Sequence, residues 1–141
     1  MIWQTTRFKI DLAEPKIMGI VNVTPDSFSD GGQFFAPGSG MASAMAWCEQ
    51  LIKEGANILD IGGESTRPGA APAPVQEELD RVMPVLETLL GCGIPISIDT
   101  QKSNVMAAAI KAGAAMINDV NALQADGALK VCGAANVAVC L

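Results

Sequence analysis

Short amide and carboxylate side chains close four apolar runs in this sequence of 141 residues. Asn22 ends the run 20–22, and Asp60, Asp99 and Asn118 end similar runs further along the chain. Amides and carboxylates offer donors and acceptors that match a ligand edge carrying ring N–H, amino and carbonyl groups, as an aminopyrimidinone does. A site that binds a hard cation such as Ca²⁺ or Mg²⁺ through the protein alone would instead contain several carboxylates close together. The pattern therefore favours a site for a small heterocycle.

Any one of these residues, taken singly, is as typical of a helix cap or a turn. Four of them in equivalent positions favour a shared role, because the carboxyl ends of parallel strands meet at one edge of a sheet. We therefore expect their side chains to surround one pocket.

Two long polar segments, 24–40 and 62–74, follow the first two runs and are rich in Gly, Pro, Ser and Thr. Loops of this length in a compact domain are usually functional or disordered. The second segment includes Arg67, whose guanidinium could clamp a carboxylate or a phosphate. Both segments are expected to border the pocket.

The elements that must position these residues alternate regularly. Five aliphatic runs are predicted to be parallel strands buried on both faces, at 17–23, 58–61, 94–98, 115–117 and 137–141. Helical spacing of apolar residues occupies the intervening segments, at 41–53, 75–90, 104–111 and 125–131. A strand regularly followed by a helix predicts successive βα units and an α/β fold.

Four βα units and a fifth strand correspond to about half of a (β/α)8 TIM barrel, which takes roughly 250 residues. An open doubly wound sheet is the alternative. A buried strand would be a poor natural terminus. We therefore expect a partial TIM barrel in one domain, residues 1–141, that is truncated.

Composition excludes several classes of function. The chain has 9 Lys and Arg, 15 Asp and Glu and no His, giving a net charge of −6, which argues against a nucleic-acid partner. Any chemistry must therefore proceed without the usual general base. The four cysteines form no C-x-x-C pair, and no signal peptide or membrane span is evident. We expect a reduced, cytoplasmic protein without a membrane partner.

The two longest motifs resemble those of the dihydropteroate synthase family. They are MGIVNVTPDSFSDGG at 18–32 and DIGGESTRPG at 60–69. The shorter segments ISIDT at 96–100 and IND at 117–119 fit the same family. The resemblance extends over most of the chain and corresponds to the pterin-binding, N-terminal half of the family's TIM barrel.

The resemblance implies a transferase of folate biosynthesis. Such enzymes condense (7,8-dihydropterin-6-yl)methyl diphosphate with 4-aminobenzoate, using Mg²⁺, to give 7,8-dihydropteroate and diphosphate. Sulfonamides compete with 4-aminobenzoate in this family. The implied partners are these small molecules, and the implied assembly of the whole protein is a homodimer.

The resemblance also implies a set of site residues. They are Asn22 and Asp30 for catalysis, Thr66, Asp99 and Asn118 around the pterin diphosphate, and Phe28, Ser65, Arg67 and Pro68 around 4-aminobenzoate. Asn22 is the implied Mg²⁺ ligand, and Asp30 the acid that stabilises the cationic carbon. Asp60 matches a family position for which a supporting role is expected.

Later strands of the family supply a further pterin-binding acid, a Lys, an Arg and a His. The 141 residues alone are therefore expected to be poorly active or inactive. Three alternatives stay open: a pterin-binding methyltransferase domain, a non-catalytic pterin-binding fragment, and an incomplete gene model.

Overall fold

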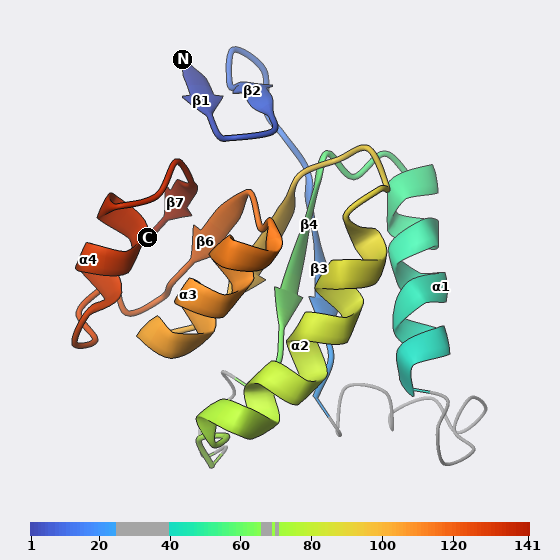
Figure 1. Cartoon of the computed structure of the whole chain (residues 1–141). Helices are drawn as coiled ribbons and strands as arrows, with labels where there is room; N and C mark the ends of the chain where they lie inside the picture. The colour runs from blue at the N-terminus through green and yellow to red at the C-terminus, as the bar shows by residue number, and fades with distance from the viewer. Residues whose placement is uncertain (25–39, 66–68, 70) are drawn as a thin grey trace.

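A computed structural model describes residues 1–24, 40–65, 69 and 71–141. Its main element is a parallel sheet of five strands in the order β3-β4-β5-β6-β7 (Figure 1). The strands are β3 (Met18–Asn22), β4 (Ile58–Gly62), β5 (Ile96–Asp99), β6 (Met116–Asn118) and β7 (Ala138–Cys140). Each predicted strand is thus present, with bounds that shift by at most two residues.

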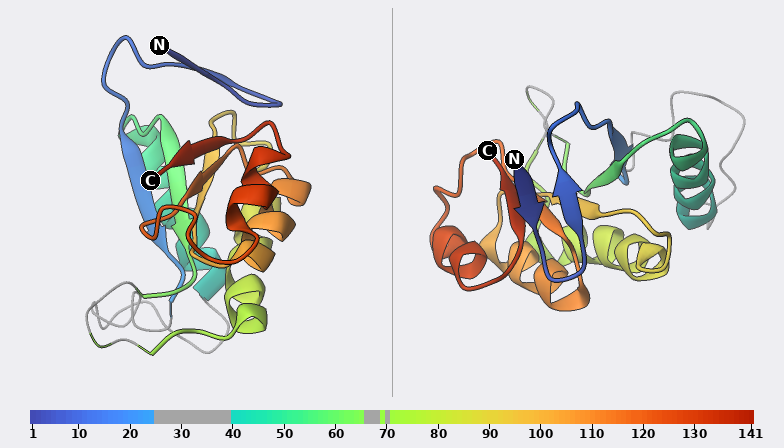
Figure 2. Two further views of the ribbon diagram at one scale, coloured as in Figure 1. Left: turned by 90° about the vertical axis from the view of Figure 1, so that its left-hand side faces the viewer. Right: turned by 90° about the horizontal axis from the view of Figure 1, so that it is seen from above.

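Within the described ranges, four helices follow these strands and lie on one side of the sheet (Figure 2). They are α1 (Gly40–Lys53), α2 (Val75–Leu89), α3 (Ser103–Ala112) and α4 (Ala128–Gly133). A doubly wound sheet reverses its strand order and carries helices on both faces. Here the strand order equals the chain order and the helices share one face, which is the arrangement of a partial TIM barrel.

The two faces of the sheet belong to different apolar clusters. Side chains on the helix side, including Leu59, Ile61 and Ile98, are buried against the helices in the larger core. Alternate positions point to the other face, because side chains along a strand alternate with a period of two. On that inner face, Ile58 and Met116 belong to a second, smaller cluster.

An N-terminal hairpin covers the inner cluster at the amino ends of the strands (Figure 1). Its strands, β1 (Ile2–Gln4) and β2 (Lys9–Asp11), pair antiparallel. Ile10 is buried there with Ile58, Met116 and Ala138. The hairpin therefore closes the end of the inner face that is opposite to the predicted site.

The helix predicted at 125–131 begins later, at Ala128. Gly127, the N-cap, has a left-handed backbone with φ 79°, which separates the turn before it from the helix. Further upstream, the two carboxylate oxygens of Asp119 accept hydrogen bonds from the backbone N–H groups of Asn121 and Leu123, both at 2.8 Å. None of the helices in the described ranges combines the length and apolarity needed to cross a membrane.

Candidate functional site

One row of residues crosses the sheet at the carboxyl ends of its strands. Asn22 is in register with Gly62, Gly62 with Asp99, and Asp99 with Asn118. Residues in register on parallel strands present their side chains on the same face. The structure therefore brings Asn22, Asp99 and Asn118 together on the inner face, as the sequence pattern predicted.

Gly62 leaves space in the middle of this row. A Cβ atom on Gly62 would lie 3.3 Å from Asn22 Oδ1 and 3.6 Å from Asp99 Oδ2. An amide oxygen and a carboxylate oxygen thus flank a position that holds no side chain. A flat ligand can approach the backbone there and meet polar atoms on both sides.

Asp60 lies one pleat below the row on the same face. The prediction that it ends its strand is wrong, because β4 continues to Gly62. Asp60 is 4% exposed, and its Oδ2 accepts a hydrogen bond of 2.9 Å from Asn118 Nδ2. Its Oδ1 and the neighbouring Ser97 Oγ are buried without a hydrogen-bond partner in the described part of the chain.

Asp99 is the titrating group of the row. Burial raises the pKa of its carboxyl to about 6, and the charge of Asp60 adds to the shift, followed by Glu78, Asp119 and Glu64. The acid can therefore change protonation state between pH 5 and 7. It can accept a hydrogen bond from a ligand N–H when ionised and donate one when protonated.

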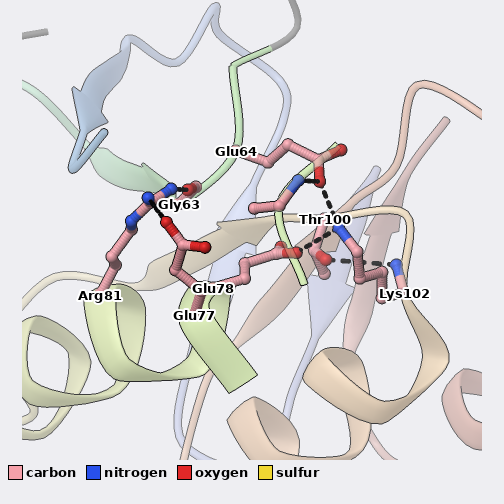
Figure 3. A network of polar contacts seen from close by, with 8 residues as sticks. Gly63, Glu64, Glu77, Glu78, Arg81, Thr100 and Lys102 are labelled. Carbon is pink, nitrogen blue, oxygen red and sulfur yellow. Dashed lines mark hydrogen bonds and ion pairs between the residues drawn. The ribbon is translucent and has the colours of Figure 1, made fainter. Parts of the chain in front are cut away.

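A partly buried ion network links Glu64, which follows β4, to Glu78 and Lys102 (Figure 3). Lys102 Nζ donates to Glu78 Oε2 at 2.6 Å and also to Glu64 Oε2, which accepts a second bond from the Ala73 N–H at 2.8 Å. Burial lowers the pKa of Lys102, but its bonds to Glu64 and Glu78 outweigh that effect and the net shift is upward. Lys102 therefore stays charged.

The same network holds the start of the second long segment against α2 (Figure 3). Arg81 donates to the Gly63 carbonyl at 2.8 Å and pairs with Glu77. A Cβ on Gly63 would lie 3.1 Å from Glu78 Cγ and 3.2 Å from its backbone carbonyl oxygen, so the close approach to α2 favours glycine. Both ends of the segment 63–73 are thus tied to the helix layer.

The other predicted site residues are placed unevenly. Ser65 is partly buried and follows Glu64 directly. Five further predicted residues lie outside the described ranges, namely Phe28, Asp30, Thr66, Arg67 and Pro68. Asp119, which directly follows β6, belongs to the turn that leads to α4 and not to the pocket row.

The sequence analysis missed the Lys102 network. Lys102 is 38 residues from Glu64 and 24 residues from Glu78, so no local sequence pattern predicts either pair.

In the described ranges, no three His, Cys, Asp or Glu side chains form a group able to hold a metal. Asn22 and Asp99 have oxygens that flank Gly62, and these could coordinate a metal ion whose other ligands come from a bound substrate and water.

Comparisons with known proteins agree on one family. Residues 18–141 match the model of the pterin binding enzymes. The chain is 51% identical over 142 residues to the dihydropteroate synthase of Neisseria meningitidis serogroup C, covering 99% of this chain and 49% of that protein. The chain thus spans about half the length of the curated relatives it matches.

Solved structures show the same likeness. A Xanthomonas albilineans dihydropteroate synthase with 4-aminobenzoic acid superposes with a TM-score of 0.87 at 50% identity, over 97% of this chain and 51% of that one. A Burkholderia cenocepacia dihydropteroate synthase complexed with 7,8-dihydropteroate superposes with a TM-score of 0.84 at 42% identity, over 99% and 45% of the two chains.

Proposed function

The chain belongs to the family of pterin binding enzymes, and on this premise we propose that it supplies the pterin-binding half of a dihydropteroate synthase. The proposed reaction joins (7,8-dihydropterin-6-yl)methyl diphosphate to 4-aminobenzoate and releases diphosphate. The observation that carries the proposal is the row Asn22–Gly62–Asp99–Asn118, in a chain 51% identical to such a synthase.

The donor set of the row suits the pterin. Asn118 offers both a carbonyl oxygen and an N–H, and Asp99 offers an acid whose pKa is about 6. A pterin edge alternates donors and acceptors, so amide and carboxyl groups side by side can satisfy it. We assign Asp99 and Asn118 to the pterin, with Thr66 on the diphosphate side.

The chemistry requires little strong base. The amine nitrogen of 4-aminobenzoate forms a bond to the methylene carbon, the carbon–oxygen bond to diphosphate breaks, and the amine loses a proton. Positive charge develops on the carbon as the leaving group departs, so a fixed negative charge nearby stabilises the transition state. Asp30 is proposed for this role, which requires no histidine from these 141 residues.

Mg²⁺ is proposed as the cofactor, with Asn22 as its protein ligand. The donor chemistry fits, because Mg²⁺ keeps several waters and is commonly shared between one or two protein oxygens and substrate phosphates. Asn22 Oδ1 faces the open position above Gly62. When bound, the ion would neutralise charge on the departing diphosphate.

The 4-aminobenzoate side is assigned to the loop residues Phe28, Ser65, Arg67 and Pro68. Glu64 fixes the two ends of the second long segment, because its carboxylate accepts bonds from Lys102 and from the Ala73 N–H. A cytoplasmic homodimer without nucleic-acid or membrane partners is proposed for the whole protein.

The test is condensation by the whole protein, measured as dihydropteroate formed from both substrates, with Mg²⁺ present and with the ion removed by chelation. Product that depends on Mg²⁺ and on 4-aminobenzoate supports the proposal. Pterin binding without product in the presence of both substrates contradicts it and favours a methyltransferase or a non-catalytic pterin-binding protein. In the active protein, Asp99→Ala is expected to weaken pterin binding at least tenfold in calorimetry.

A further inference from the structure

We propose that Asp60 is a positioning residue that fixes the orientation of the Asn118 amide, and that the site thereby selects a 2-amino pteridine over its 2-oxo counterpart. This inference deepens the proposed function and rests on it. Asp60 does not need to touch the ligand to act in this way.

The contact that carries the inference joins two neighbouring levels of the inner face. Asn118 Nδ2 lies 2.9 Å from Asp60 Oδ2. A carboxylate can only accept hydrogen bonds, so it requires the nitrogen of the amide and excludes its oxygen. The Asn118 amide therefore has one defined orientation rather than two.

Both partners are held firmly. Asp60 lies within β4, which is flanked by β3 and β5, and its side chain is buried. Asn118 ends β6, and its backbone carbonyl oxygen accepts a hydrogen bond of 3.0 Å from the Thr100 backbone N–H. Neither backbone can turn to compensate for a change in the other side chain.

The fixed orientation has a chemical consequence. Asp60 uses one N–H of the Asn118 amide, which leaves an edge made of the second N–H and the carbonyl oxygen for a ligand. That edge can donate to a ring nitrogen and accept from an amino group next to it, which is the pattern at N1 and the 2-amino group of a pterin. Lumazine, the 2-oxo counterpart of pterin, has the reverse pattern, with a hydrogen on N1 and an oxygen at position 2. It would need the Asn118 amide in the opposite orientation.

The experiment compares the affinities of pterin and lumazine for the whole protein by calorimetry. The unmodified protein is expected to bind pterin at least tenfold more tightly, since one mismatched hydrogen bond in a buried site is worth about that factor. Asp60→Asn keeps the shape but can donate or accept, so the Asn118 amide can take both orientations. The ratio of the two affinities is expected to fall at least threefold.

Two controls separate this role from a general structural one. Ser97→Ala changes the neighbour of Asp60 on the same face, and the affinity ratio should stay constant. Asn118→Ala should lower the ratio by itself, and adding Asp60→Asn to it should change nothing further. Asp60→Ser removes the obligate acceptor with a smaller side chain and gives the same test if Asp60→Asn unfolds.

The outcomes are distinct. An unchanged ratio in Asp60→Asn, or equal losses for both ligands, would overturn the positioning role while pterin binding still supports the proposed function. Failure of the unmodified protein to bind either pteridine would contradict the proposed function and the inference together.

Discussion

Gly62 keeps open the space between Asn22 and Asp99. A methyl group there would lie 3.3 Å from Asn22 Oδ1, so the amide must shift by a few tenths of an ångström and the floor of the pocket rises. We expect Gly62→Ala to raise the KM for the pterin substrate about tenfold, since overpacking costs about 1–2 kcal/mol.

Gly133→Ala is the matched control, because nothing lies within 4 Å of the corresponding position. Steady-state kinetics and thermal unfolding of both variants check the prediction. An unchanged KM in Gly62→Ala would show that the open position is not used by the substrate.

Asp99 makes stability depend on pH. The pKa of Asp99 is about 6 in the folded chain, above the ordinary 3.8, so the folded state binds the proton more tightly than the unfolded state does. The free energy of unfolding therefore decreases as the pH rises from about 4 to 6 and the acid ionises. We expect Asp99→Asn to match the unmodified protein near pH 3.5 and to exceed its stability above pH 6.

Two pKa units correspond to about 3 kcal/mol, and partial exposure of Asp99 reduces the expected gain to about 1–2 kcal/mol. Urea unfolding at pH 3.5, 5 and 8 measures the difference. A gap of equal size at all three values would mean that Asp99 is not the group responsible.

At the scale of elements, the strands and helices were predictable because each is a run with its own apolar period. The hairpin β1–β2 was not, since two strands of three residues carry no run long enough to stand out. The convergence of Asn22, Asp99 and Asn118 was predictable, because each of them lies at the carboxyl end of a parallel strand. The bond from Asn118 to Asp60 did not, because it depends on where β4 ends.

The Lys102 network joins the first turn of α2 to the start of α3 and to the second loop. Glu78 is fully buried and has Lys102 as its ion-pair partner. Removing one partner of a buried pair costs about 3–5 kcal/mol, whereas replacing both by apolar groups costs less. We expect Lys102→Met to destabilise by about 3 kcal/mol and to raise the KM for 4-aminobenzoate.

The double variant Glu78→Leu/Lys102→Met is expected to recover part of that stability in denaturant unfolding. Glu77→Ala is the control, because its side chain is 51% exposed and its pair with Arg81 should contribute less than about 1 kcal/mol. Equal destabilisation by Lys102→Met and Glu77→Ala would contradict the network's role.

At the scale of the whole molecule, the described sheet has two edge strands, β3 and β7, each paired on one side. Ile20 on the inner face is 61% exposed. Unpaired edges and exposed apolar faces favour association between chains. We expect residues 1–141 alone to self-associate in size-exclusion chromatography and to form no measurable dihydropteroate.

Coexpression with the second half of a related synthase should give a soluble complex and restore turnover. The prediction fails if residues 1–141 are monomeric and turn over at ordinary enzyme rates, about 1–10³ per second.

The order of the strands in the sheet is also the order in which a ribosome synthesises them. Each new strand pairs with its immediate predecessor, so none has to wait for a later strand of this sheet. Domains commonly begin to fold during synthesis. The pocket floor can thus assemble progressively from Asn22 to Asn118 while downstream codons are still being translated.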